Sequence, residues 1–114
     1  MNSLHISVVI PRSPQDVYEF VTRPENLSQW VAGVDISVTP VKFTARNEFG
    51  VMDHTVTLPD GSFVFVPLRV LPAEHGSEVV FTLRRVAGAT DREFEADRAA
   101  VEADLATLAS ILQT

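Results

Sequence analysis

The sequence predicts an α+β fold in which a curved antiparallel sheet wraps around a long C-terminal helix, with two short helices after the first strand. Three patterns favour this fold. Apolar residues alternate along the first ten positions, helix-capping signals recur between residues 13 and 33, and apolar residues recur at helical spacing in residues 90–114. With 114 residues, of which 46% are hydrophobic, the chain is predicted to be one domain, residues 1–114, around one core.

The first element is predicted to be a strand. Leu4, Ile6, Val8 and Ile10 alternate with the residues between them, which gives the period of two that marks a strand with one buried face.

Two short helices are predicted next. Ser13 can cap a helix whose first position is Pro14, because its hydroxyl can accept from the free amides of the first turn. Thr22 and Glu25 have the spacing of a capping box, which predicts a second start, and Gly33 is predicted to end that helix.

A meander of short antiparallel strands is predicted for residues 34–85, where "TP", "RNEFG", "PDG" and "EHG" are turn signals between runs rich in Val, Thr and Phe. Thr90 and Glu93 form another capping-box pair and are predicted to open the terminal helix. The apolar face of that helix consists of Phe94, Val101, Leu105, Leu108 and Leu112.

The stretch "IPRSPQDVYEFVTRPENLSQWVAG" resembles the start of the SRPBCC superfamily, which includes START lipid-transfer domains, pollen-allergen-like proteins and polyketide cyclases. The later stretches "FGVMDHTVTLPDGSFVFVPLRVLP" and "EVVFTLRR" resemble its short polyketide-cyclase/dehydrase-like members. This resemblance implies the helix-grip fold, with a cavity between the sheet and the terminal helix. It also implies that Trp30 fills the junction between the short helices and the terminal helix, either as core packing or as a ligand contact.

The "PDG" turn decides which strand face is predicted to line that cavity. If the loop has two residues, or four, Leu58 lies opposite Phe63, and His54 and Phe65 share a face with Met52. A three-residue loop would reverse this assignment.

The rest of the predicted cavity follows from the next turn and from the terminal helix. With Leu71 opposite Val79, the same face gains Arg69, Phe81 and Leu83, while Arg98 lies within the apolar stripe of the helix. The predicted ligand contacts are Trp30, Met52, His54, Phe65, Arg69, Phe81, Leu83, Phe94, Arg98 and Val101.

Three of these residues are polar, and each has an alternative role. His54 either serves the site or bonds a backbone carbonyl, and Arg69 and Arg98 either reach the cavity or extend to water or to a carboxylate. Asp53 is adjacent to His54, but neighbours on a regular strand point to opposite faces, so a catalytic Asp–His pair is not predicted.

Composition excludes several partners. A net charge of −6 disfavours nucleic acid and anionic membranes. The sequence has no cysteine and three scattered histidines, so neither a disulfide nor a metal site is predicted, and no cofactor motif is recognised. The first residues lack the pattern of a secretion signal, which leads us to expect a cytoplasmic protein.

Three functions remain open. The first is binding or carrying a small hydrophobic or amphipathic molecule, with an acidic group if both arginines reach the cavity. The second is an enzyme resembling the polyketide cyclases or dehydratases, in which His54 is the catalytic group that exchanges a proton. The third is an interaction module with a closed core; a predicted outer row of Val64, Val66, Leu68 and Val70 favours a homodimer.

Overall fold

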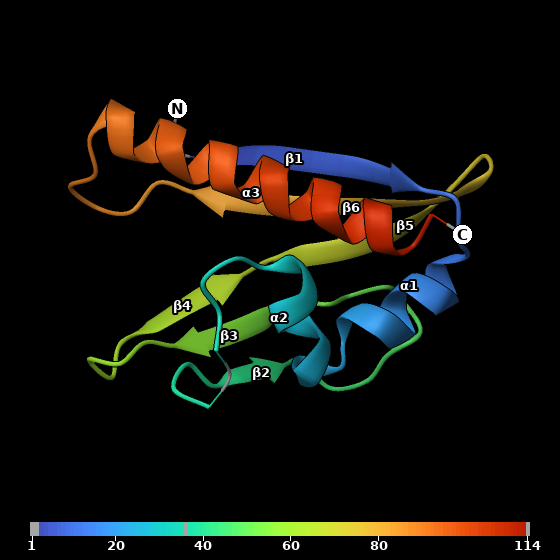
Figure 1. Ribbon diagram of the computed structural model, residues 1–114, viewed down its shortest axis with the longest axis horizontal. Coiled ribbons are helices and arrows are strands. Elements are labelled where there is room, and N and C mark those ends of the chain that lie inside the picture. Colours follow the sequence, from blue (N-terminus) through green and yellow to red (C-terminus); the bar gives the residue numbers. More distant parts are fainter. Residues whose placement is uncertain (1–2, 36, 114) are drawn as a thin grey trace.

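The computed structural model describes residues 3–35 and 37–113. Figure 1 shows an α+β architecture, as predicted, with a long C-terminal helix lying across part of an antiparallel sheet. The elements, in chain order, are β1 (Ser3–Ile10), α1 (Pro14–Val21), the 3₁₀ turn η1 (Pro24–Asn26), α2 (Leu27–Trp30), β2 (Val41–Phe43), β3 (His54–Thr57), β4 (Phe63–Val66), β5 (Leu68–Ala73), β6 (Gly76–Arg84) and α3 (Asp91–Ile111).

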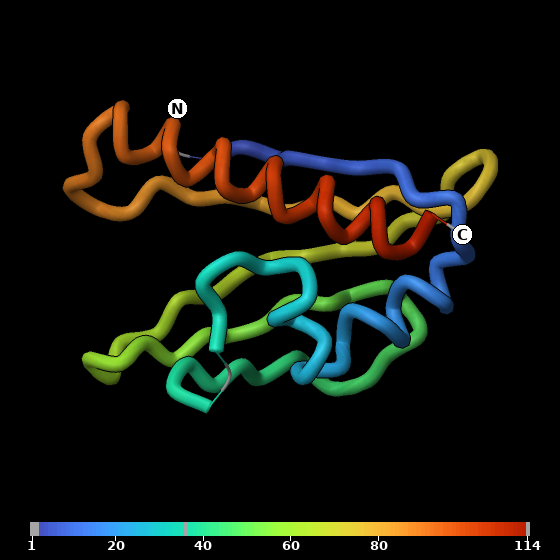
Figure 2. Tube along the Cα trace, in the orientation of Figure 1, coloured from blue at the N-terminus to red at the C-terminus, as the bar shows by residue number. Residues whose placement is uncertain are grey.

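The strands form two three-stranded antiparallel sheets with the orders β1-β6-β5 and β2-β3-β4. Strands β4 and β5 follow each other directly around Pro67, which has no N–H to donate to a ladder. Two backbone hydrogen bonds extend the β3 side of the ladder onto β5: Met52 N donates to Leu68 O (2.8 Å) and Val70 N donates to Gly50 O (2.9 Å). The two sheets therefore meet along β5, and Figure 2 shows the continuous path through β4 and β5.

The core lies where α3 and the short helices cover the sheet. Helix α3 contacts β1, β6 and α2, and α1 contacts β5 and β6. The predicted capping box that opens α3 is confirmed, since the side chains of Thr90 and Glu93 each bond the other's backbone N–H. The largest fully buried side chains include Ile10, Val17, Val21, Met52, Leu68, Val79, Leu105 and Leu108.

The prediction for the short helices is confirmed at the first cap and wrong at the second. Ser13 Oγ accepts from Asp16 N (3.1 Å) at the start of α1. Thr22 instead ends α1, and its hydroxyl donates to Tyr18 O (2.7 Å). This bond back along the helix competes with capping of the next one, which begins at Pro24 without a side-chain cap.

The "PDG" hairpin has the three-residue loop, so the predicted pairing of Leu58 with Phe63 is wrong. Leu58 N donates to Ser62 O (2.8 Å), and Gly61 N donates to Leu58 O (2.9 Å). Gly61 has a φ of +87°, and Asp60 accepts from Ser62 N (2.9 Å), so both residues favour this tight loop. Phe63 consequently pairs with Thr57.

A shift of one residue turns every side chain of a strand to the other face. The next turn is also shifted, because Val70 rather than Leu71 lies opposite Val79. Phe65 and Arg69 therefore lie on the outer face, which corrects their predicted place in the cavity. The predicted outer row of Val64, Val66, Leu68 and Val70 lies instead on the inner face, where Leu68 and Val70 are buried.

Candidate functional site

Several predicted site residues lie on the inner side of the sheet, packed into the core or beside it. Met52, Trp30 and Phe94 are buried. Phe81 and Val101 are partly buried against that core. Leu83 is half-buried, and it shares the inner face with Phe81 because it lies two residues further along β6. Leu105 and Leu108 of α3 are fully buried here, so core side chains fill the layer between this helix and the sheet.

His54 is also buried, with 7% of its surface exposed. Its Nδ1 lies 3.0 Å from Met52 O, which is the carbonyl alternative considered from the sequence, and its ring lies 4.9 Å from that of Phe43. Burial lowers the pKa of His54, which favours a neutral ring at pH 7.

The two arginines do not join His54 but pair with carboxylates, which is the alternative considered for them from the sequence. On the outer face, Arg69 donates to both carboxylate oxygens of Asp53 (2.9 and 2.8 Å), and these bonds lower the pKa of Asp53. Arg98 pairs along its own helix with Glu95 and with Glu102 (2.9 Å). Asp53 is therefore engaged away from His54, as the strand geometry predicts.

Trp30 is part of the core, and only 4% of its surface is exposed. Helix α2, which ends at Trp30, contacts α3, so the predicted junction between these helices is present. Within the described part of the chain, no acceptor bonds the buried indole Nε1.

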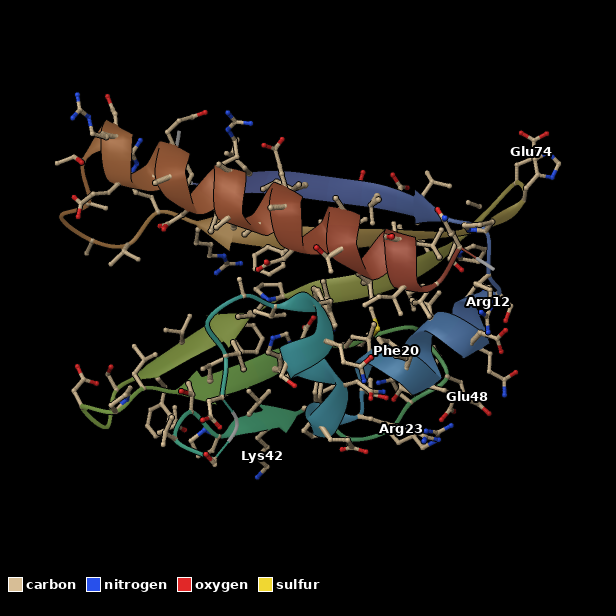
Figure 3. All side chains as sticks on the ribbon, in the orientation of Figure 1. Arg12, Phe20, Arg23, Lys42, Glu48 and Glu74 are labelled. Carbon is tan, nitrogen blue, oxygen red and sulfur yellow. The ribbon has the colours of Figure 1, made fainter. Side chains whose placement is uncertain are left out.

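A groove of about 730 Å³ lies away from the predicted cavity, between α1, the loop of residues 46–50 and β5. Figure 2 shows this loop running beside α1, and Figure 3 labels Glu48 on it. The groove is lined by Pro14, Gln15, Tyr18, Glu19, Arg46, Asn47, Glu48, Phe49, Gly50, Val70 and Pro72. None of the ten predicted ligand contacts is among these residues.

Asn47 fixes the conformation of the loop. Its Oδ1 accepts from Phe49 N (2.9 Å) and Val51 N (3.1 Å), and its Nδ2 donates to Val51 O (2.9 Å). Gly50 has a φ of +75° and packs so closely on the Val70 carbonyl that a Cβ there would overlap the oxygen. This bonded loop leaves the Phe49 side chain 82% exposed at the groove.

Helix α1 supplies the opposite wall. The Tyr18 hydroxyl accepts from Asn47 N (3.0 Å), which ties the loop to the helix. The guanidinium carbon of Arg46 lies 5.3 Å from the centre of the Tyr18 ring, and Arg46 also pairs with Glu19. The hydrogen bond from Arg46 lowers the pKa of Glu19, so this carboxylate is charged at neutral pH.

The groove thus combines an exposed aromatic ring, a cation on an aromatic face and fixed polar groups. The sequence prediction treated "RNEFG" only as a turn. One feature of this stretch indicated a binding role: Phe49 is a large apolar residue within an otherwise polar turn. Loops held by a rigid scaffold often carry binding residues.

No protein-family model matches the chain, and no curated protein matches it. Solved structures do. DynU16, described as a putative protein in the dynemicin biosynthetic locus, aligns with a TM-score of 0.77 and 15% identity. The alignment covers 100% of this chain and 48% of DynU16, so the chain spans about half of that protein.

Two further structures match over nearly their whole length. A protein from Mesorhizobium loti has a TM-score of 0.74 and 13% identity, with 96% of each chain covered. The Aha1 dimer from Colwellia psychrerythraea has a TM-score of 0.59 and 19% identity, with 99% of this chain and 97% of that chain covered. The shared architecture is the helix-grip fold. At these identities the likeness establishes the fold alone, because this fold carries many functions.

Within residues 3–35 and 37–113, none of the helices has the length and apolar character needed to cross a bilayer. The same residues contain no cluster of three or more His, Asp or Glu side chains arranged to hold a metal ion.

Proposed function

We propose that this helix-grip chain binds a small amphipathic molecule in the groove between α1 and the 46–50 loop. The observation that carries this proposal is Phe49, a residue that is 82% exposed on a loop fixed by side-chain hydrogen bonds. A groove of about 730 Å³ matches the roughly 300–1,000 Å³ of small-molecule sites. The proposal keeps the ligand class expected from the sequence and places the site at a different position in the fold.

The binding function is favoured over the enzyme alternative by the positions of the charged groups. Enolate stabilisation beside His54 would need a nearby cation, but Arg69 lies on the outer face and Arg98 is paired with two glutamates. His54 itself is occupied by the Met52 carbonyl at Nδ1. These contacts also weaken the expectation of an acidic ligand in the interior, since that expectation required both arginines there.

Membership of the SRPBCC superfamily belongs to the same proposal. Its support is the helix-grip fold shared with DynU16 and the Mesorhizobium loti protein over at least 96% of this chain. The partly exposed Phe81 and Val101 remain predicted ligand contacts, so the experiment compares the two locations.

The test is a titration of the protein with phenethylamine, phenethyl alcohol and hydrocinnamate, followed by NMR. These probes share a phenylethyl group and differ in charge. At least one probe should bind saturably, and Phe49→Ala should weaken it by roughly tenfold, because burial of a phenylalanine is worth about 1.5–3 kcal/mol. Val86→Ala is the control, since Val86 is 65% exposed and lies outside both the groove and the sheet.

Retention of wild-type affinity by Phe49→Ala, or the absence of saturable binding by all three probes, would contradict the proposal. A loss of affinity in Phe81→Ala with none in Phe49→Ala would place the ligand at the inner face of the sheet instead.

We also propose that two copies of the chain associate through the outer sheet face. Phe63 and Phe65 are 71% and 58% exposed on that face. Neighbouring exposed apolar residues of this size mark a surface that a partner covers. The Colwellia psychrerythraea neighbour, which is described as a dimer, is consistent with this proposal.

A further inference from the structure

We propose that the groove selects an organic cation, namely an ammonium or guanidinium group attached to an apolar body of about the size of a phenyl ring. This inference rests on the proposed function, because it names the ligand class of the same groove. It requires three features of the site: a place already suited to a cation, a removable internal occupant and an excess of negative charge.

The place suited to a cation is the position that the Arg46 guanidinium occupies, beside Tyr18 and Glu19. The Arg46 guanidinium lies over the Tyr18 ring, at 5.3 Å from the ring centre, and pairs with the Glu19 carboxylate. An aromatic face together with a carboxylate is the combination that recognises ammonium and guanidinium ligands, because the negative face of the ring attracts the positive charge. The position of the Arg46 guanidinium therefore marks where the groove would hold the cationic group of a ligand.

Arg46 is a removable occupant. Its side chain is 67% exposed, whereas that of Glu19 is 34% exposed, so the arginine lies on the solvent side of the pair. Exposed ion pairs contribute little to stability, and a long arginine side chain loses conformational freedom when it is held in one place. A ligand cation can therefore replace Arg46 at little cost.

The charges lining the groove favour a cation over an anion. The lining contains the carboxylates Glu19 and Glu48 and one guanidinium, that of Arg46. Arg23, which follows α1, also acts on Glu19, but its effect on the pKa of that carboxylate is smaller than that of Arg46. Because Arg46 and Glu19 neutralise each other, Glu48 leaves the lining with one negative charge in excess, which disfavours an anionic ligand, and the whole chain carries a net charge of −6.

The apolar body of the ligand has its own surface. Phe49 is 82% exposed at the loop side of the groove, and Pro14 and Pro72 supply further apolar lining. A cation attached to a phenyl-sized group can thus place its charge at Tyr18 and Glu19 and its ring against Phe49. This arrangement predicts that both parts of the ligand are needed for binding.

The first measurement is the order of affinities of the three probes for the wild-type chain. Phenethylamine should bind more tightly than phenethyl alcohol by roughly threefold to thirtyfold, and hydrocinnamate should bind most weakly. Equal or stronger binding of the alcohol or the acid, with Phe49 still required, would overturn the inference and leave the proposed function standing. Absence of Phe49-dependent binding by every probe would instead remove the proposed function.

The second measurement uses variants with opposite expected effects. Arg46→Met removes the internal occupant and should raise the affinity for phenethylamine by roughly threefold or more, whereas Glu19→Gln should lower it by a similar factor. Arg92→Met is the control, because Arg92 is exposed on α3 outside the groove, and it should leave the affinity for phenethylamine unchanged. Weaker phenethylamine binding in a folded Arg46→Met variant would show that Arg46 contacts the ligand directly, which would overturn the inference.

Discussion

At the scale of single residues, His54 shows how burial sets the charge of a side chain. Its ring lies among apolar neighbours, 4.9 Å from Phe43, and its Nδ1 contacts the Met52 carbonyl. Burial is the largest influence on the pKa of His54 and lowers it from its ordinary value of 6.5, although the Met52 carbonyl and the charge of Asp53 act in the opposite direction. The folded chain therefore holds this imidazole in its neutral form.

This lowered pKa predicts the pH dependence of stability. The unfolded chain binds a proton at His54 more readily than the folded chain, so the contribution of this group is complete above about pH 6.5 and is lost as the pH falls below that value. The free energy of unfolding of the wild type should decrease between pH 7 and pH 5, and that of His54→Leu should decrease less. Denaturant titrations of both proteins at several pH values would measure this difference.

The comparison between these two proteins cancels the contributions of other groups, including Asp104, whose pKa is raised by burial. Asp53 has a lowered pKa, so its own contribution is lost only as the pH falls below its ordinary value of 3.8. Parallel pH profiles for wild type and His54→Leu would show that His54 is not buried in neutral form.

At the scale of elements, the loop between β2 and β3 determines the shape of the groove. Its conformation depends on the Asn47 side chain and on Gly50, which has a φ of +75°. The Gly50 carbonyl accepts from Val70 N (2.9 Å), and the Gly50 Cα packs against the Val70 carbonyl. The close backbone approach therefore requires the absence of a side chain.

Two glycine substitutions separate backbone strain from close packing. Gly50 and Gly61 both have positive φ, at +75° and +87°, but a Cβ at Gly61 would meet no atom within 4 Å. Gly61→Ala should cost about 1–2 kcal/mol from backbone strain alone. Gly50→Ala should cost more and should also weaken probe binding, because the loop must move away from β5.

Thermal or denaturant unfolding of the two variants gives the comparison. Equal losses of stability, together with unchanged binding by Gly50→Ala, would mean that the loop adapts to the added methyl group without reshaping the groove.

At the scale of the whole molecule, the outer sheet face is the surface proposed above for self-association. Phe63 and Phe65 lie on β4, next to Thr57 and Thr55 on β3. Both phenylalanines are exposed, and their strand partners are uncharged. The next side chain on this face is the cation Lys42, which lies opposite Thr55, so two chains of net charge −6 can approach here with less repulsion.

Phe65→Glu should shift the chain towards monomers, because a carboxylate in an apolar interface between two copies would be desolvated without a partner. Light scattering across a concentration series would measure the change. Val86→Glu is the control, since Val86 is 65% exposed and lies outside the sheet. A wild-type chain that stays monomeric at high micromolar concentration would end this proposal.

The sequence by itself determined the order of elements and the residues that open α1 and α3. Ser13 and Thr90 act as caps in the structure because capping depends on residues within one helical turn. The first strand and the apolar face of α3 were equally predictable, since both follow from periodicity over a short stretch.

The tertiary structure alone decided the strand faces and the position of the groove. A one-residue difference in the "PDG" loop moved Phe65 and Arg69 to the outer face, because strand periodicity gives two equivalent assignments until the turn is known. The groove could not be predicted because Tyr18 and Phe49 are distant in sequence. They meet across one groove only because Asn47 ties its loop to the Tyr18 hydroxyl and Gly50 permits that loop to pack on β5.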